Sequence, residues 1–421
     1  MQVFKFGGAS VKDAVHVKNA ISIIEKCKGE KPLVVIVSAI GKMTNALEKV
    51  AEAFFAGQQE SALEQFQTLK DFHIGMAQQL LDRYLDSCTA QLTDLFTEVE
   101  WLLHDQAVRD FGYYYDQVVC IGELLSTTIF SFAMKENKVD NEWLDVRDIL
   151  RTDNSFREAI VDWAYSEEKI LSTIQSVNTK VDIVVTQGFI GATDDNESTT
   201  LGREGSDFTA AIFSNVLNAE ALTIWKDVDG VMNADPKLFS KAVPIRHLDY
   251  QEVIEMAYYG AQVIHPKTIK PLFSKQIPLH VKCFLDTHLQ GTVIDGEKVP
   301  DLPPILILKN NQVLVTLTTK DFSFVNGQPL VDLYQTMQSL LIRPNMIHIG
   351  AVQVQLCLND EPEKLQSLEN FAKEHFRITY QKELALTSIR HYKAENVASF
   401  AQKTSNKVLE QKDEKVWQYL A

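Results

Sequence analysis

Short runs of valine and isoleucine mark four expected strands in the first part of the chain, at residues 1–6, 32–40, 181–189 and 221–227. Glycine, serine or a polar turn follows the first three runs, as expected where a buried strand feeds a loop. Patterns typical of helices lie between the runs. This alternation of strand and helix predicts an α/β fold with a mainly parallel sheet.

The pattern changes between residues 46 and 108, where apolar side chains recur at spacings of three and four. Leu92, Leu95, Val99 and Leu102 are one such series. A stripe of this kind is typical of amphipathic helices that bury one face. We therefore predict a helical insertion in the first domain, with packing as its main role.

A linker is expected at residues 299–304, because three prolines in six residues disfavour helix. It divides the chain into predicted domains at 1–298 and 304–421. Residues 312–381 then follow the order strand, helix, two strands, helix, strand, which is the ferredoxin-like pattern.

A second and shortened unit is expected from residues 305–309 together with 383–420. It would contain a short helix at 394–403.

Composition and charge exclude several classes of function for this chain. The 421 residues are 45% hydrophobic and carry a formal net charge of -15, which allows a large core and argues against a nucleic-acid partner. No run of about 18 apolar residues predicts a membrane span. The five cysteines are scattered singly, without zinc-site spacing, so we expect a soluble protein of the reduced cytoplasm.

The first candidate site is the KFGGAS segment, Lys5 to Ser10, at the end of the first expected strand. Gly7 and Gly8 would let backbone N–H groups approach phosphate oxygens, and Lys5 offers a mobile positive charge. A tight turn is the alternative interpretation of the same six residues.

A second candidate runs from Ser38 to Thr44 and again follows a strand. Its hydroxyl groups could bind a small carboxylate, although Ser38 and Thr44 could equally cap the next helix.

A third candidate is the turn-rich segment at residues 200–209. Arg203 lies between Gly202 and Gly205, and arginine suits bidentate recognition of carboxylate or phosphate. Helix capping alone would explain Ser206 and Asp207, but it would not explain Arg203.

Two weaker signals complete the set. Asp227 and Asp235 follow the fourth strand and could face a Mg-nucleotide, but DxDG and ADP are also ordinary turn sequences. Glu123 lies in the partly apolar IGELLS segment, where it is either a helix-face acid or a buried carboxylate that needs a cationic partner.

Taken in order along the chain, these motifs resemble the aspartate kinase family. KFGGAS is similar to the family's KFGGTS, IGELLS to GERLS, TTLGREGSDFTA to TTLGRGGSDTTA, and YGAQVIHPKTI to GAKVLHPATI. VSAIGKMTNAL and WKDVDGVMNADP resemble VSAMGKTTNAL and TDVDGIYTADP. The resemblance covers residues 1–292, and the region that follows looks like the family's paired ACT domains.

The resemblance implies an αβα sandwich followed by a ferredoxin-like ACT region. It implies an enzyme that uses ATP with Mg²⁺ to phosphorylate the side-chain carboxylate of L-aspartate, the first step of lysine, threonine and methionine biosynthesis. Mg²⁺ would be held mainly by the ATP phosphates. A homodimer or higher oligomer through the ACT units is also implied, and an amino-acid effector is left open.

Site roles follow from the same resemblance, position by position. The catalytic residues are Lys5, Gly8 and Asp207, and the aspartate-binding residues are Ser38, Thr44, Glu123 and Arg203. The nucleotide-binding residues are Lys5, Gly7, Gly8, Ser10, Ser206, Lys226, Asp227, Asp235, Pro236 and Gln262.

The sequence departs from the family pattern at several of these positions. Lys226 replaces a threonine, Met232 a tyrosine, and Gln262 a lysine that reaches the phosphates. Our hypothesis is that Lys226 or Lys267 supplies the missing cation. Glu204 replaces a glycine and adds a negative charge beside the candidate arginine.

These departures keep two alternatives open. One is a catalytically weak subunit that senses an amino acid through its ACT units, with Asp321 as the candidate effector-binding acid and His348 where an acid would be expected. The other is a kinase of the same fold acting on acetylglutamate, glutamate or UMP.

Overall fold

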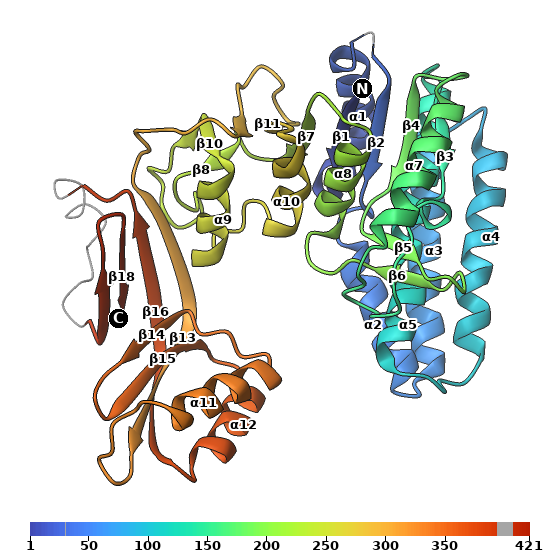
Figure 1. Cartoon of the computed structure of the whole chain (residues 1–421). Helices are drawn as coiled ribbons and strands as arrows, with labels where there is room; N and C mark the ends of the chain where they lie inside the picture. The colour runs from blue at the N-terminus through green and yellow to red at the C-terminus, as the bar shows by residue number, and fades with distance from the viewer. Residues whose placement is uncertain (30, 394–406) are drawn as a thin grey trace. The chain divides into compact units, whose positions relative to one another are not determined.

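A computed structural model describes residues 1–29, 31–393 and 407–421, and it divides them into two compact units (Figure 1). The first unit comprises Met1–Val231, Pro244–Ala257 and Gln262–Val299. The second comprises Met232–Val243, Tyr258–Ala261 and Pro300–Ala421. The chain therefore enters the second unit twice before the proline-rich linker.

The first unit is built on an eight-stranded sheet with the order β10-β12-β11-β7-β1-β2-β4-β3. Its strands are β1 (Gln2–Phe6), β2 (Leu33–Val37), β3 (Glu142–Leu144), β4 (Ile183–Gln187), β7 (Leu222–Lys226), β10 (His247–Asp249), β11 (Leu279–Cys283) and β12 (Thr292–Asp295). Every pair is parallel except β11 with β12. The expected mainly parallel α/β sheet is confirmed.

Helices surround this sheet. They are α1 (Ala14–Cys27), α2 (Met43–Phe55), α3 (Gln59–Leu80), α4 (Leu85–His104), α5 (Phe111–Val119), α6 (Ile121–Glu136), α7 (Trp163–Val177), α8 (Gly205–Val216), α9 (Tyr250–Tyr259) and α10 (Pro266–Lys275). Helices α2, α3 and α4 occupy the region expected to be a helical insertion. Figure 1 shows α3 and α4 as long rods in the blue to cyan part of the chain.

Helices α5 and α6 form an apolar stretch, Phe111–Glu136, that is long and apolar enough to cross a membrane by length and composition. Its most apolar window is 89% buried inside the fold. The burial is that of a core helix, which explains why almost every side chain of α6 is apolar or small.

Several short elements lie between these strands and helices. They are the 3-10 turns η1 (Gly8–Val11) and η2 (Val146–Asp148), the hairpin of β5 (Ile190–Ala192) and β6 (Ser198–Thr200), and the strands β8 (Val231–Met232) and β9 (Pro244–Ile245).

The second unit contains a six-stranded antiparallel sheet with the order β14-β15-β13-β16-β18-β17. In chain order its elements are β13 (Ile305–Thr319), α11 (Gln328–Ser339), β14 (Met346–Ile349), β15 (Gln353–Asn359), α12 (Pro362–Ala372), β16 (Phe376–Arg390), β17 (Leu409–Lys412) and β18 (Val416–Leu420). The expected ferredoxin-like region is thus confirmed. The helix predicted at 394–403 lies outside the described residues.

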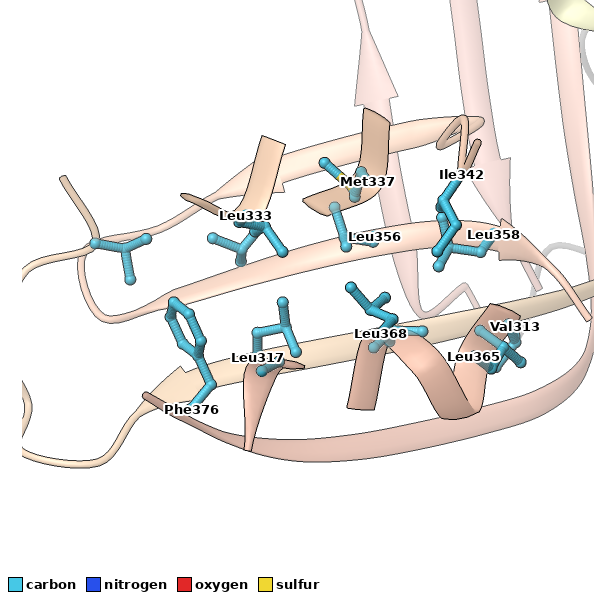
Figure 2. Packing of buried hydrophobic residues seen from close by; sticks show 14 residues of the cluster. Val313, Leu317, Leu333, Met337, Ile342, Leu356, Leu358, Leu365, Leu368 and Phe376 are labelled. Carbon is cyan, nitrogen blue, oxygen red and sulfur yellow. The ribbon is translucent and has the colours of Figure 1, made fainter. Parts of the chain in front are cut away.

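Helices α11 and α12 cover one face of this sheet. Figure 2 shows Leu333 and Met337 of α11 and Leu368 of α12 pointing toward Leu317 and Leu356 of the strands. These side chains are at most 3% exposed. Their burial supplies the apolar core that the alternating pattern of strands and helices requires.

Candidate active site

Two glycine-containing loops meet at the carboxyl ends of the neighbouring parallel strands β1 and β2. A side chain at Gly8 would place its Cβ 2.6 Å from the carbonyl oxygen of Gly41 and 2.8 Å from that of Ala39. The N–H of Gly41 donates to the carbonyl of Gly8 at 3.0 Å. The sequence needs glycine at position 8 because the two loop backbones touch there.

Ser10 closes the first of these loops. Its hydroxyl donates to the carbonyl oxygen of Gly7 at 2.6 Å, and its N–H donates to the same oxygen at 2.9 Å. The side chain is 1% exposed. The loop is therefore held in one conformation by its own residues.

Lys5, at the inner end of β1, forms a buried ion pair. Its Nζ lies 2.6 Å from Oδ1 of Asp207, and the two residues are 9% and 3% exposed. Burial would raise the pKa of Asp207, but the charges of Lys5 and Lys226 outweigh that effect and hold the pKa below its ordinary value. The carboxylate therefore stays ionised and fixes the direction of the Lys5 ammonium.

Asp207 lies in the first turn of α8, where a negative charge also interacts favourably with the helix dipole. The helix begins at Gly205 without any side-chain cap. The capping interpretation of Ser206 and Asp207 is therefore wrong. The carboxylate of Asp207 is directed to lysine instead.

Glu123 of α6 is a buried carboxyl group with one oxygen unused. Oε1 accepts from the N–H of Ala39 at 3.3 Å, and Oε2 has no hydrogen-bond partner among the described residues. Burial raises the pKa of Glu123 to about 8, against the opposing effects of the backbone hydrogen bond and the charge of Lys5. Such a group can receive an ammonium ion, which would satisfy Oε2 and restore the ionised form.

The Ser38 to Thr44 segment is held against the same helix. Ser126 of α6 donates its hydroxyl to the carbonyl of Ser38 at 2.7 Å. Helix α2 begins at Met43 without a side-chain cap, so neither Ser38 nor Thr44 serves as one. Both side chains are half-buried.

The segment before α8 presents Arg203 to solvent. Gly202 and Glu204 on either side have φ values of +73° and +55°, in the left-handed region. The carboxylate of Glu204 accepts from the N–H of His265 at 2.8 Å. Its negative charge is thus engaged with the loop before α10.

Asp116 is a residue of this site that the sequence interpretation missed. It is fully buried in α5 and accepts from the N–H of Arg157 at 2.9 Å and from the N–H and hydroxyl of Thr200 at 2.8 and 2.7 Å. Burial raises its pKa to about 6, against the effect of these hydrogen bonds. It fixes the strand that leads into Arg203. The available signal was an aspartate inside an otherwise apolar and aromatic helix.

The other members of the predicted nucleotide-binding set are divided between the two units. Lys226 lies beside Asp207, with Nζ 3.9 Å from Oδ2. Asp227 and Gln262 are solvent-exposed side chains of the first unit. Asp235 and Pro236 belong to the second unit, on Met232–Val243.

Comparison with known proteins shows the family of this chain. Residues 1–283 match the amino acid kinase family. The lysine-sensitive aspartokinase 3 of Escherichia coli (strain K12) is 31% identical over 359 residues, which cover 85% of this chain and 78% of that protein. A bifunctional aspartokinase/homoserine dehydrogenase 1 of Arabidopsis thaliana, chloroplastic, is 35% identical over 69% of this chain, which spans only 32% of that longer protein.

Solved structures agree with the sequence relatives. The crystal structure of E. coli aspartokinase III in complex with aspartate and ADP matches the whole chain and 96% of its own, with a TM-score of 0.83 and 27% identity. The same enzyme in complex with lysine and aspartate matches with a TM-score of 0.80 and 28% identity. The chain belongs to the amino acid kinase family and, within it, to the aspartokinases.

Proposed function

We propose that this aspartokinase transfers the γ-phosphoryl group of ATP to the side-chain carboxylate of L-aspartate at the site that contains Lys5, Asp207 and Glu123. The buried ion pair of Lys5 with Asp207, 2.6 Å long and next to the glycine loop, is the observation that carries this assignment. It supplies a fixed cation and close backbone N–H groups where a phosphoryl group needs both.

The transfer itself needs no general base. A carboxylate oxygen of aspartate forms a bond to the γ-phosphorus, the bond from phosphorus to the bridging oxygen breaks, and ADP leaves with the electron pair. The nucleophile is already ionised at neutral pH, so positioning and charge stabilisation are the tasks left to the protein. The product is 4-phospho-L-aspartate.

In this proposal, the loop after β1 makes the phosphate contacts. The N–H groups of Gly7 and Gly8 and the ammonium of Lys5 contact the transferred group, while Asp207 keeps Lys5 oriented. Ser10 holds the loop closed through its bonds to the carbonyl of Gly7. Preorganised donors of this kind need no rearrangement as charge develops.

Aspartate is held on the other side of the transferred group. The free Oε2 of Glu123 receives its ammonium group, and Arg203 receives its α-carboxylate in a bidentate pair. The hydroxyls of Ser38 and Thr44 donate to the remaining oxygens. The complex of the E. coli relative with aspartate and ADP supports aspartate as the substrate.

The remaining nucleotide contacts in this proposal are those that the resemblance to aspartate kinases implies. Ser206 and Asp227 face the phosphates. Gln262 is neutral and exposed, so it adds no charge to the site.

Mg²⁺ accompanies ATP in this proposal. Among the described residues, no group of three or more His, Cys, Asp or Glu side chains forms a metal site. We assign Mg²⁺ mainly to the ATP phosphates, because this ion commonly binds through one or two carboxylates together with substrate phosphates. Asp227, exposed directly after β7, is the carboxylate that fits this role. When bound, the ion neutralises charge on the phosphate oxygens.

For the C-terminal unit we propose a regulatory and assembly role. The E. coli relative binds lysine as well as aspartate in one of its structures. Strand β14 is an edge of the sheet and is free to pair with a second copy of the unit in a homodimer. Asp321 uses one carboxylate oxygen to accept from the N–H and hydroxyl of Ser323, and we propose that this acid binds the effector.

A cytoplasmic location completes the proposal. All five cysteines are free thiols, as expected of a protein kept in a reducing compartment.

Trapping of the product tests the function. The protein is supplied with ATP, Mg²⁺, aspartate and hydroxylamine, and the aspartyl hydroxamate is measured. We expect hydroxamate with aspartate and none with glutamate or acetylglutamate as acceptor. UMP has no carboxylate to trap, so it is tested by ADP formation, and none is expected. Absence of hydroxamate, with aspartate binding intact, would favour an amino-acid-sensing subunit. Repeating the assay with lysine, threonine and methionine identifies the effector.

A further inference from the structure

The carboxylate of Asp207 lies between two lysines rather than one. Lys5 is 2.6 Å from Oδ1, and the Nζ of Lys226 is 3.9 Å from Oδ2. One carboxylate cannot neutralise two ammonium ions, so the three groups together carry a net charge of about +1. This excess of positive charge, partly shielded from water, attracts an anion.

Lys226 is held in place by a second contact that leaves its charge available. Its Nζ donates to the carbonyl oxygen of Val263 at 2.7 Å. The side chain is 27% exposed, whereas that of Lys5 is 11% exposed. The ammonium is thus positioned by the backbone, and it is the more accessible of the two cations.

Among the described residues, Asp207 is the one carboxylate found within 4 Å of both ammonium groups. Glu123, the next carboxyl group of the site, is mainly protonated at neutral pH because burial raises its pKa to about 8. Without Lys226, the pair of Lys5 and Asp207 would be neutral overall and would attract a polyphosphate weakly.

The anchor of Lys226 is adjacent to Gln262, where the resemblance to aspartate kinases implies a lysine. Val263 directly follows Gln262, and the side chain of Gln262 is exposed and neutral. The cation that this segment lacks is therefore supplied from the end of β7, at the backbone of the same segment.

We propose that Lys226 is a phosphate-binding residue that acts with Lys5 on the triphosphate of ATP and replaces the cation absent at position 262. This inference rests on the proposed kinase function and adds to it. Among the residues that the structure describes, Lys226 forms an ion pair with Asp207, and Lys267, the other lysine considered from the sequence, does not. The competing explanation is a structural one, in which Lys226 only fastens the segment at Val263.

Inhibition by inorganic tripolyphosphate separates the two explanations, because this probe contains the phosphates without the nucleoside. Lys226→Met is expected to weaken competitive inhibition of the kinase by tripolyphosphate about tenfold or more, the loss typical of one contact between charged groups. Inhibition by adenosine is expected to stay unchanged. Lys226→Arg, which keeps the charge and the donors, is expected to keep the binding of tripolyphosphate.

Two further variants sharpen the result. Lys282→Met is the matched control, because Lys282 lies beside Trp225 in the register of β11 with β7 and so faces the opposite side of the sheet from Lys226. It is expected to match the unmodified protein. In the double variant Lys226→Thr with Gln262→Lys, tripolyphosphate binding is expected to return.

The inference is overturned if Lys226→Met binds tripolyphosphate as the unmodified protein does, or if adenosine and tripolyphosphate weaken together. Failure of the proposed function looks different, since the unmodified protein would then form no aspartyl hydroxamate at all.

Discussion

Binding of aspartate should release a proton, because the carboxyl group that receives its ammonium is protonated beforehand. The pKa of Glu123 is raised to about 8 by burial. At pH 7 only about one molecule in ten then carries the ionised form, and ionisation costs about 1.4 kcal/mol. A bound ammonium favours the ionised form, so the apparent dissociation constant should fall about tenfold from pH 6 to pH 7.

Titration calorimetry in two buffers of different ionisation enthalpy measures the effect. At pH 7 we expect about 0.9 proton released for each aspartate bound, and about half a proton at pH 8. Glu123→Gln, which keeps the shape but cannot ionise, should bind aspartate more weakly and release no proton. The reasoning is refuted if the unmodified protein releases no proton, or if Glu123→Gln releases as much.

Three further predictions follow from individual contacts. The pKa of Glu123 in the folded protein lies above its unfolded value, so the stability that the protonated carboxyl contributes is complete below pH 4.5 and is lost as pH rises through 8. Glu123→Gln should therefore raise the melting temperature of the ligand-free protein at pH 8.5 but not at pH 4. The gain in the free energy of unfolding at pH 8.5 should be at most about 5 kcal/mol. Gly8→Ala would place a Cβ 2.6 Å from a backbone carbonyl and should lower kcat at least about 100-fold, whereas Gly75→Ala, where nothing lies within 4 Å, should leave kcat unchanged and serves as its control. Asp116→Ala should raise the KM for aspartate more than it lowers kcat, while Asp116→Asn, which keeps an oxygen for the N–H donors, should restore the KM; equal effects of both variants would contradict a positioning role.

Much of the fold could be predicted because each motif follows a strongly apolar strand. The carboxyl ends of parallel strands gather at one edge of a sheet, so Lys5 and the segment from Ser38 had to be neighbours once the strands were recognised. The pairing of Lys5 with Asp207 could not be found this way. Those residues are 202 positions apart, and only the resemblance connected them.

Other features depend on tertiary contacts that no local pattern encodes. The segment expected at 305–309 and the strand expected to begin at residue 312 are one strand, β13, because pairing with β16 continues through a register shift beside Asn311, whose φ is +55°. Asp116 gave no clear signal, because an acid in a helix can face solvent, cap a neighbour or hold a loop. Its three donors come from segments remote in sequence.

The site predicted here is tested most directly by a crystal structure of this chain with aspartate and ADP. We expect the aspartate ammonium within hydrogen-bond distance of Oε2 of Glu123, its α-carboxylate on Arg203, and the ADP phosphates beside Lys5 and Lys226. Aspartate bound away from Glu123, or phosphates that contact neither lysine, would contradict it.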